Sequence, residues 1–152
     1  MLLLHFMLSV FLVHLVHELG HAYFAKLFGA KVNEISIGTG PAMIHIKKLT
    51  FRLGLLLGGY CYWEEKHNLS VVRISIIHLG GIIFNLISAS FILMLMSTFQ
   101  FPGYKDFLMF VLYSYALVIL NGIPYRFGLI KSDGWQVIEI FVYWVKTCLK
   151  KR

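Results

Sequence analysis

The sequence predicts a membrane protein that is mainly α-helical and carries a small β-sheet between its first two long helices. The chain has 152 residues, of which 59% are hydrophobic and 14% are charged, whereas soluble domains average about 25% charged residues. Two apolar stretches, residues 2–28 and 71–96, are each long enough to cross a bilayer. Between them, residues 31–68 show a different pattern, in which β-branched and aromatic residues alternate with polar ones.

The first apolar stretch is a predicted membrane helix over residues 2–28. At 1.5 Å per residue it spans roughly 40 Å, more than the roughly 30 Å of the hydrocarbon core, and Gly29 stands where a C-terminal helix cap is expected. In the β region, residues 31–68, we expect strands at 32–37 and 43–51 joined by the turn Gly38-Thr39-Gly40-Pro41.

The second half of the chain predicts a second membrane helix, a short third helix and a break. The helix at 71–96 contains Gly80-Gly81 and a lone Asn85, which favour close helix packing. After a short loop around Phe101-Pro102-Gly103, the stretch 107–120 is too short to cross alone. We therefore expect the broken segment 121–134 to lie at membrane depth beside a cavity, with a last helix at 135–149. All elements form one domain, 1–152.

The formal charge of +7 does not indicate a nucleic-acid partner, because the basic residues lie in connections and at the C-terminus rather than on one polar face. Their distribution predicts topology: residues 29–70 carry five basic residues, whereas the next connection has Lys105, so the former is expected on the cytoplasmic side. We favour three spans with an interfacial or re-entrant last helix, and four spans remain the alternative. The localisation expected is a multi-pass protein of a bacterial cell membrane.

The segment His17-Glu18-Leu19-Gly20-His21 predicts a catalytic metal site. Two histidines four residues apart on a helix can reach one metal ion, and Glu18 lies near the same face, placed to take a proton from water. Ionisable residues inside membrane helices are costly and usually functional. The position of Glu18 in the first helix predicts a site near the cytoplasmic face. His14, one turn earlier, is expected to be a packed neighbour of the site.

A catalytic zinc usually has three protein ligands, and the third is expected to be a carboxylate. The acidic candidates are Glu34, Glu64, Glu65, Asp106, Asp133 and Glu139. The predicted topology places Asp106 on the wrong side, whereas Asp133 stands beside the broken segment and is followed by glycine. Asp133 is therefore the best-placed candidate. The two cysteines, Cys61 and Cys148, lack metal-site spacing and are expected to be free thiols.

With these motifs the chain resembles the site-2 proteases, the intramembrane zinc metalloproteases of peptidase family M50. The family's elements are matched in order by the HExxH segment at 17–21, by Leu57-Gly58-Gly59-Tyr60, by Gly80-Gly81 with Asn85, and by Asn121 and Pro124 before Asp133-Gly134. Gly81 stands where the family usually has proline, and the gap from Pro124 to Asp133 is longer than in many members. The chain looks like a minimal core without the PDZ or CBS domains of many relatives.

The resemblance implies that zinc is bound by His17, His21 and Asp133 and that Glu18 is the general base. It also implies that Asn85, together with Asn121, positions substrate or water. The expected substrate is a membrane-embedded or membrane-adjacent segment of a protein or small peptide, selected by the core itself or by a regulatory membrane partner.

Two alternative functions belong to other classes of protein, a metal-ion transporter or sensor and an inactive zinc-binding scaffold. A metal-ion transporter or sensor would require polar residues to recur along several helices, but the later helices offer only His78 and Asn85 near the core. An inactive zinc-binding scaffold is disfavoured because Glu18 is intact.

Overall fold

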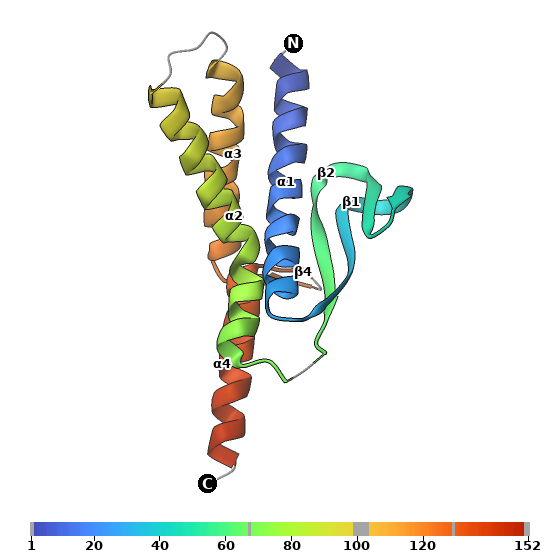
Figure 1. Ribbon diagram of the computed structural model, residues 1–152, viewed down its shortest axis with the longest axis vertical. Coiled ribbons are helices and arrows are strands. Elements are labelled where there is room, and N and C mark those ends of the chain that lie inside the picture. Colours follow the sequence, from blue (N-terminus) through green and yellow to red (C-terminus); the bar gives the residue numbers. More distant parts are fainter. Residues whose placement is uncertain (1, 67, 99–103, 129, 151–152) are drawn as a thin grey trace.

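The computed structural model describes residues 2–66, 68–98, 104–128 and 130–150; the expected loop at 101–103 lies outside these ranges. The described chain is a helical bundle with a β-sheet packed along one side (Figure 1). In chain order its elements are α1 (Leu2–Leu27), β1 (Lys31–Ile46), β2 (Leu49–Glu64), α2 (Val71–Thr98), α3 (Tyr104–Gly122), β3 (Arg126–Phe127), β4 (Ile130–Lys131) and α4 (Asp133–Lys150).

Helices α1 and α2 are the two described helices that are long and apolar enough to cross a membrane. Both expose large hydrophobic side chains, among them Leu4, Leu8, Ile87 and Phe91, as helices surrounded by lipid do. Helix α1 ends where expected, because Gly29 takes a positive φ of 82° and its N–H donates to the Lys26 carbonyl. The protein is therefore mainly helical and suited to a membrane.

The β region differs from the expected strands. The turn of the hairpin lies at Lys47-Lys48, where Lys47 has a φ of 55°, and not at Gly38–Pro41. The predicted turn residues lie inside the long strand β1, where Gly38 and Gly40 take φ values of 92° and 82°. Glycine tolerates these left-handed conformations, so the segment bends β1 without ending it.

Part of β1 pairs with two different parts of β2, because both long strands bend. Ile35 is paired with Cys61 on one side and with Leu49 on the other, so the first half of β1 is an inner part of the sheet. The last part of β2, residues 59–64, pairs with β1 on one side only, and its other side is a free edge within the described residues. This edge faces α1 and the site described below.

Helices α1 and α2 cross at two glycines. A Cβ atom added to Gly20 would lie 2.2 Å from the Gly80 carbonyl oxygen, and one added to Gly80 would lie 2.6 Å from the Gly20 carbonyl oxygen. Backbone therefore meets backbone at the crossing, as small residues permit in membrane bundles. This contact fixes the position of His21, the residue that follows Gly20.

The break after α3 continues into the small hairpin of β3 and β4 and then into α4. Helix α4 begins at Asp133, two residues before the expected start, because Ser132 caps it by accepting a hydrogen bond from the Trp135 N–H (3.2 Å). Figure 1 shows α3 and α4 one above the other along α2. Side chains of α4, including Ile140 and Trp144, face the first turns of α2 at Val71 and Ile74.

The expectation of an interfacial or re-entrant last helix stays a prediction, as does the alternative of four spans. Helix α4 continues in the direction in which α3 descends, and its later part extends beyond the lower ends of α1 and α2 (Figure 1). Its side chains Ile140 and Trp144 lie near the start of α2.

Candidate metal centre and active site

The centre of the site is one face of α1. His17 and His21 are one helical turn apart, with ring centroids separated by 4.9 Å, and both are buried together with Glu18. Gly20 lets α2 approach this face closely. The helical spacing predicted from the sequence therefore places three ionisable side chains in the interior of the bundle.

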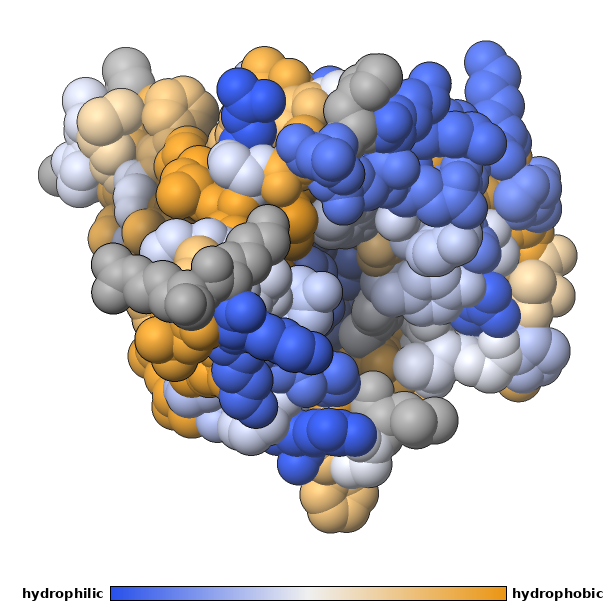
Figure 2. Space-filling model, turned by 90° about the horizontal axis from the view of Figure 1, so that it is seen from below, coloured by the Kyte–Doolittle hydropathy of each residue, from blue (hydrophilic) through white to orange (hydrophobic). Residues whose placement is uncertain are grey.

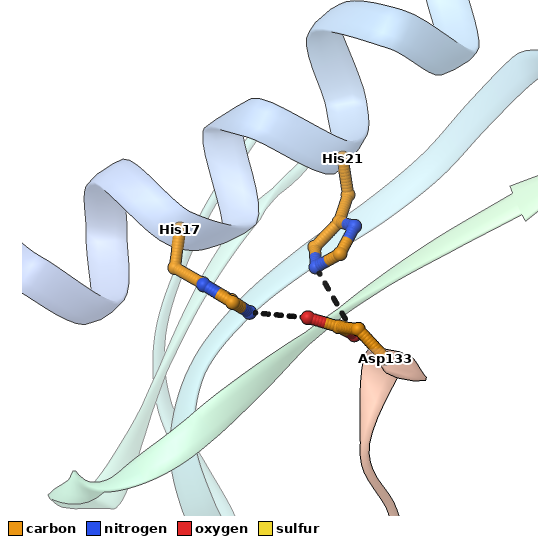
Figure 3. A group of neighbouring side chains, drawn as sticks. All are labelled: His17, His21 and Asp133. Atoms are coloured by element: carbon orange, nitrogen blue, oxygen red, sulfur yellow. Dashed lines mark ion pairs between the residues drawn. The ribbon is translucent and has the colours of Figure 1, made fainter. Parts of the chain in front are cut away.

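Asp133 reaches this face from the first turn of α4 (Figure 3). Its Oδ2 lies 3.1 Å from His17 Nε2, and its Oδ1 lies 3.6 Å from His21 Nε2. Asp133 Oδ2 is buried without a hydrogen-bond partner. The break in the chain between α3 and α4 thus brings a carboxylate distant in sequence to the two histidines.

The three side chains fit a zinc ion. Each offers one ligand atom, and these atoms all lie within 4.8 Å of one another. Zinc bonds to histidine nitrogen and carboxylate oxygen are about 2.0–2.2 Å long, so one ion can lie between ligand atoms that are this close together. Two imidazoles with one carboxylate is a donor set typical of catalytic zinc, which leaves one coordination position open.

Helix α2 contacts the Nδ1 atoms of both histidines, on the side of each ring away from Asp133. His21 Nδ1 lies 2.8 Å from the Ile77 carbonyl oxygen; only a protonated Nδ1 can donate to it, so the lone pair of a neutral ring is on Nε2, facing Asp133. The Asn85 side chain lies 3.3 Å from His17 Nδ1. Between them Gly81 leaves room for the His17 ring, because a Cβ there would lie 2.5 Å from His17 Cε1.

A cavity of about 740 Å³ adjoins the metal ligands. Glu18 lies on its wall beside Gly59 of β2, where an added Cβ would be 2.9 Å from Glu18 Cγ. Viewed from below, the molecule is hollowed near its centre, with hydrophilic side chains around the hollow (Figure 2). The other lining residues include His14, Gly58, Tyr60, Cys61, His78, Tyr113, Leu117, Asn121, Tyr125 and Lys131.

The two asparagines singled out from the sequence lie in different places. Asn121 lines the cavity, and its Nδ2 donates to the Leu117 carbonyl (3.2 Å). Asn85 is fully buried and contacts His17 rather than the cavity. The role of either residue in positioning substrate or water stays a prediction.

Sequence reasoning missed parts of the cavity wall. Tyr113 lies on it and is hydrogen bonded to His14 at 3.0 Å, but a tyrosine in an apolar helix gives no signal of such a partner. Arg52 also lines the cavity and donates hydrogen bonds to Ser36 Oγ (2.7 Å) and the Gly40 carbonyl (3.0 Å). The positive charge of Arg52 inside a strand was the available signal.

Known proteins resemble this chain over most of its length. The model of peptidase family M50 matches residues 5–150. An uncharacterized membrane protein of Bacillus subtilis, YwmF, is 28% identical over 139 residues, which cover 91% of this chain and 87% of that protein.

Two longer proteins match a shorter part. Proteins named "Putative zinc metalloprotease" from Borreliella burgdorferi and Thermotoga maritima are 44% and 46% identical over 64 and 63 residues, about 40% of this chain. The matched parts are 15% and 13% of those two proteins. Together with the match to the family model, these similarities show that the chain is a membrane protein that belongs to peptidase family M50, a family of zinc metalloproteases.

Proposed function

We propose that this protein is a zinc-dependent endopeptidase that cleaves a peptide bond within or beside the membrane. The observation that carries the proposal is the buried group of His17, His21 and Asp133, which lies beside Glu18 on the wall of a cavity. Two helices of the surrounding bundle are long and apolar enough to cross a membrane. A buried carboxylate next to two histidines is costly in lipid unless it has a function.

Zinc, when bound, polarises the scissile carbonyl and makes a water molecule more acidic. His17, His21 and Asp133 hold the ion, while Glu18 has a free carboxylate on the cavity wall. Glu18 takes the proton of the attacking water and then passes it to the nitrogen of the leaving amine. Because Glu18 is only 4% exposed, bulk water does not compete for that proton.

The free edge of β2 is the proposed binding surface for the substrate. A helical segment must unwind before cleavage, because its carbonyls are already hydrogen bonded. The opened segment can then pair with the edge at residues 59–64 by strand addition. At Gly59 this edge passes directly beside Glu18, so a peptide paired there runs past the general base.

The same architecture supports a topology with three crossings. Helix α3 lies beside the second half of α2 and α4 beside the first half (Figure 1), so the two together form one broken crossing with the site at the break. The end of α4, with Lys146 and Lys150, then lies at the opposite end of the bundle from the start of α1 (Figure 1), which agrees with the positive-inside tendency if α1 starts outside. In this proposed topology the site lies near the cytoplasmic face.

The test is co-expression with a panel of single-span membrane peptides, followed by mass spectrometry of the products. We expect the parent to cleave at least one of them, and Glu18→Gln to abolish this cleavage while zinc content stays near one ion per chain. Glu65→Gln is the matched control, since Glu65 is an exposed residue outside the edge at 59–64, and its carboxylate accepts a hydrogen bond from the Leu69 N–H. A Glu18→Gln protein that cleaves as fast as the parent would rule out the proposed mechanism.

A further inference from the structure

We infer that Asn85 is a positioning residue that holds His17 in the tautomer able to bind metal, by accepting a hydrogen bond from His17 Nδ1–H through its carbonyl oxygen Oδ1. The inference rests on the proposed zinc site and extends it to a residue that contacts no substrate. It assigns Asn85 to the back of the His17 ring rather than to substrate or water.

Asn85 and His17 are both buried where α1 and α2 meet. Asn85 has no exposed surface and His17 is 5% exposed, so water cannot substitute for a missing partner. Asn85 Nδ2 lies 3.3 Å from His17 Nδ1. Asn85 Oδ1 has no hydrogen-bond partner, so the contact of Nδ2 with His17 is the one side-chain hydrogen bond of this amide that the described residues show.

The two orientations of the amide correspond to two states of His17. With Nδ2 facing the ring, Nδ1 must accept, and the ring proton is then on Nε2, which lies 3.1 Å from Asp133 Oδ2. This arrangement suits the site without metal. When zinc takes the Nε2 lone pair, the proton of the neutral ring moves to Nδ1, and Nδ1–H and Nδ2–H would be two donors facing each other.

Half a turn of the amide removes this conflict. Oδ1 then takes the position of Nδ2 and accepts from Nδ1–H, and the rotation breaks no hydrogen bond of Oδ1 because it has none. His21 already has the equivalent support, since its Nδ1 lies 2.8 Å from the Ile77 carbonyl. Ile77, Gly81 and Asn85 are spaced by four residues, so one face of α2 supports both ligands.

A merely structural role predicts a different behaviour. Buried asparagines also join membrane helices by hydrogen bonds, and in that case any substitution would lower stability without a specific effect on zinc. The distinction is whether the side chain at position 85 can accept a hydrogen bond. Asn85→Asp keeps the acceptor, whereas Asn85→Leu removes it at similar size.

The experiment measures zinc affinity of the full chain in detergent by competition with a chelator, without any substrate. We expect Asn85→Leu to weaken zinc binding by about 10–100-fold, the usual loss for an outer partner of a metal ligand, and Asn85→Asp to stay within threefold of the parent or bind more tightly. The control is Ser90→Ala, which removes a hydrogen bond between α2 and α3, from Ser90 to Tyr115 at 2.9 Å; it should leave zinc affinity unchanged.

A second readout does not depend on how well the variants fold. In the zinc-loaded parent, ¹⁵N spectra of labelled histidine should show His17 protonated on Nδ1. The inference is overturned if Asn85→Leu binds zinc like the parent, if Asn85→Asp loses as much affinity as Asn85→Leu, or if Nδ1 carries no proton. A parent that binds no zinc would overturn the proposed function as well, which separates the two failures.

Discussion

The glycine crossing of α1 and α2 makes Gly20→Ala a sharp test of how the bundle holds the metal site. The new methyl group would lie 2.2 Å from the Gly80 carbonyl oxygen and 2.7 Å from its carbon. Because both atoms are backbone, no side-chain rotation relieves the clash. The helices must move apart by about 1 Å to reach an ordinary contact of 3.4 Å.

A separation of this size reaches both histidines. The contact of His21 Nδ1 with the Ile77 carbonyl (2.8 Å) and that of His17 Nδ1 with Asn85 (3.3 Å) both cross from α1 to α2, so both stretch beyond hydrogen-bond range. Each outer contact is worth about 10–100-fold in metal affinity. We therefore expect Gly20→Ala to weaken zinc binding by at least about 100-fold.

The stability change should be smaller and separable from the loss of zinc. Overpacking costs about 1–3 kcal/mol, and alanine recovers up to about 1 kcal/mol through its higher helix propensity. The assay is chelator competition together with thermal unfolding of the metal-free protein. Gly122→Ala is the matched control, because a methyl group there meets nothing within 4 Å. A Gly20→Ala protein with zinc affinity within threefold of the parent would refute the reasoning.

Three further predictions use other parts of the site. Asp133→Ala should weaken zinc binding by more than about 100-fold, since losing a ligand exceeds the loss of an outer contact; normal zinc content would exclude Asp133 as a ligand. Burial and the nearby charge of Glu18 raise the pKa of Cys61 to about 12, so a maleimide at pH 8 should label the exposed Cys148 and leave Cys61 unmodified, which peptide mapping checks. Gly59→Val should reduce cleavage at least tenfold and leave zinc affinity unchanged, because a Cβ at 59 would lie 2.5 Å from the Ser36 carbonyl oxygen and 2.9 Å from Glu18 Cγ, and its three nearest atoms include no metal ligand; equal cleavage would argue against a substrate path beside β2.

The long helices and the first two ligands were predictable from local pattern alone. Apolar length fixed α1 and α2 to within two residues, and the spacing of His17 and His21 needs only helical geometry. The hairpin turn was predicted wrongly because Gly38–Pro41 has strong turn residues, yet β1 continues through it. What overrides the local signal is pairing: Ala42 and Ile44 find partners in Arg52 and Phe51 of β2, so the chain bends there and turns at Lys47.

The contacts between helices could not be read from the chain, because they depend on which faces meet. Asn85 was recognisable as a polar residue in an apolar helix, but only the crossing at Gly20 and Gly80 shows that it faces the back of His17. Tyr113 carried no signal at all, since its partner His14 lies 99 positions away.

The break between α3 and α4 explains how Asp133 can reach the two histidines. A carboxylate in the middle of a continuous apolar helix would have to be buried beside unbroken backbone, with no free N–H groups near it. At the start of α4 the same carboxylate lies at a helix N-terminus, where unpaired N–H groups and the helix dipole favour negative charge. Gly134 packs tightly there, since an added Cβ would lie 2.3 Å from the Gly122 carbonyl oxygen. The close packing of Gly134 on the end of α3 therefore fixes the depth at which Asp133 meets His17 and His21, and the interruption that shortens α3 is the feature that completes the site.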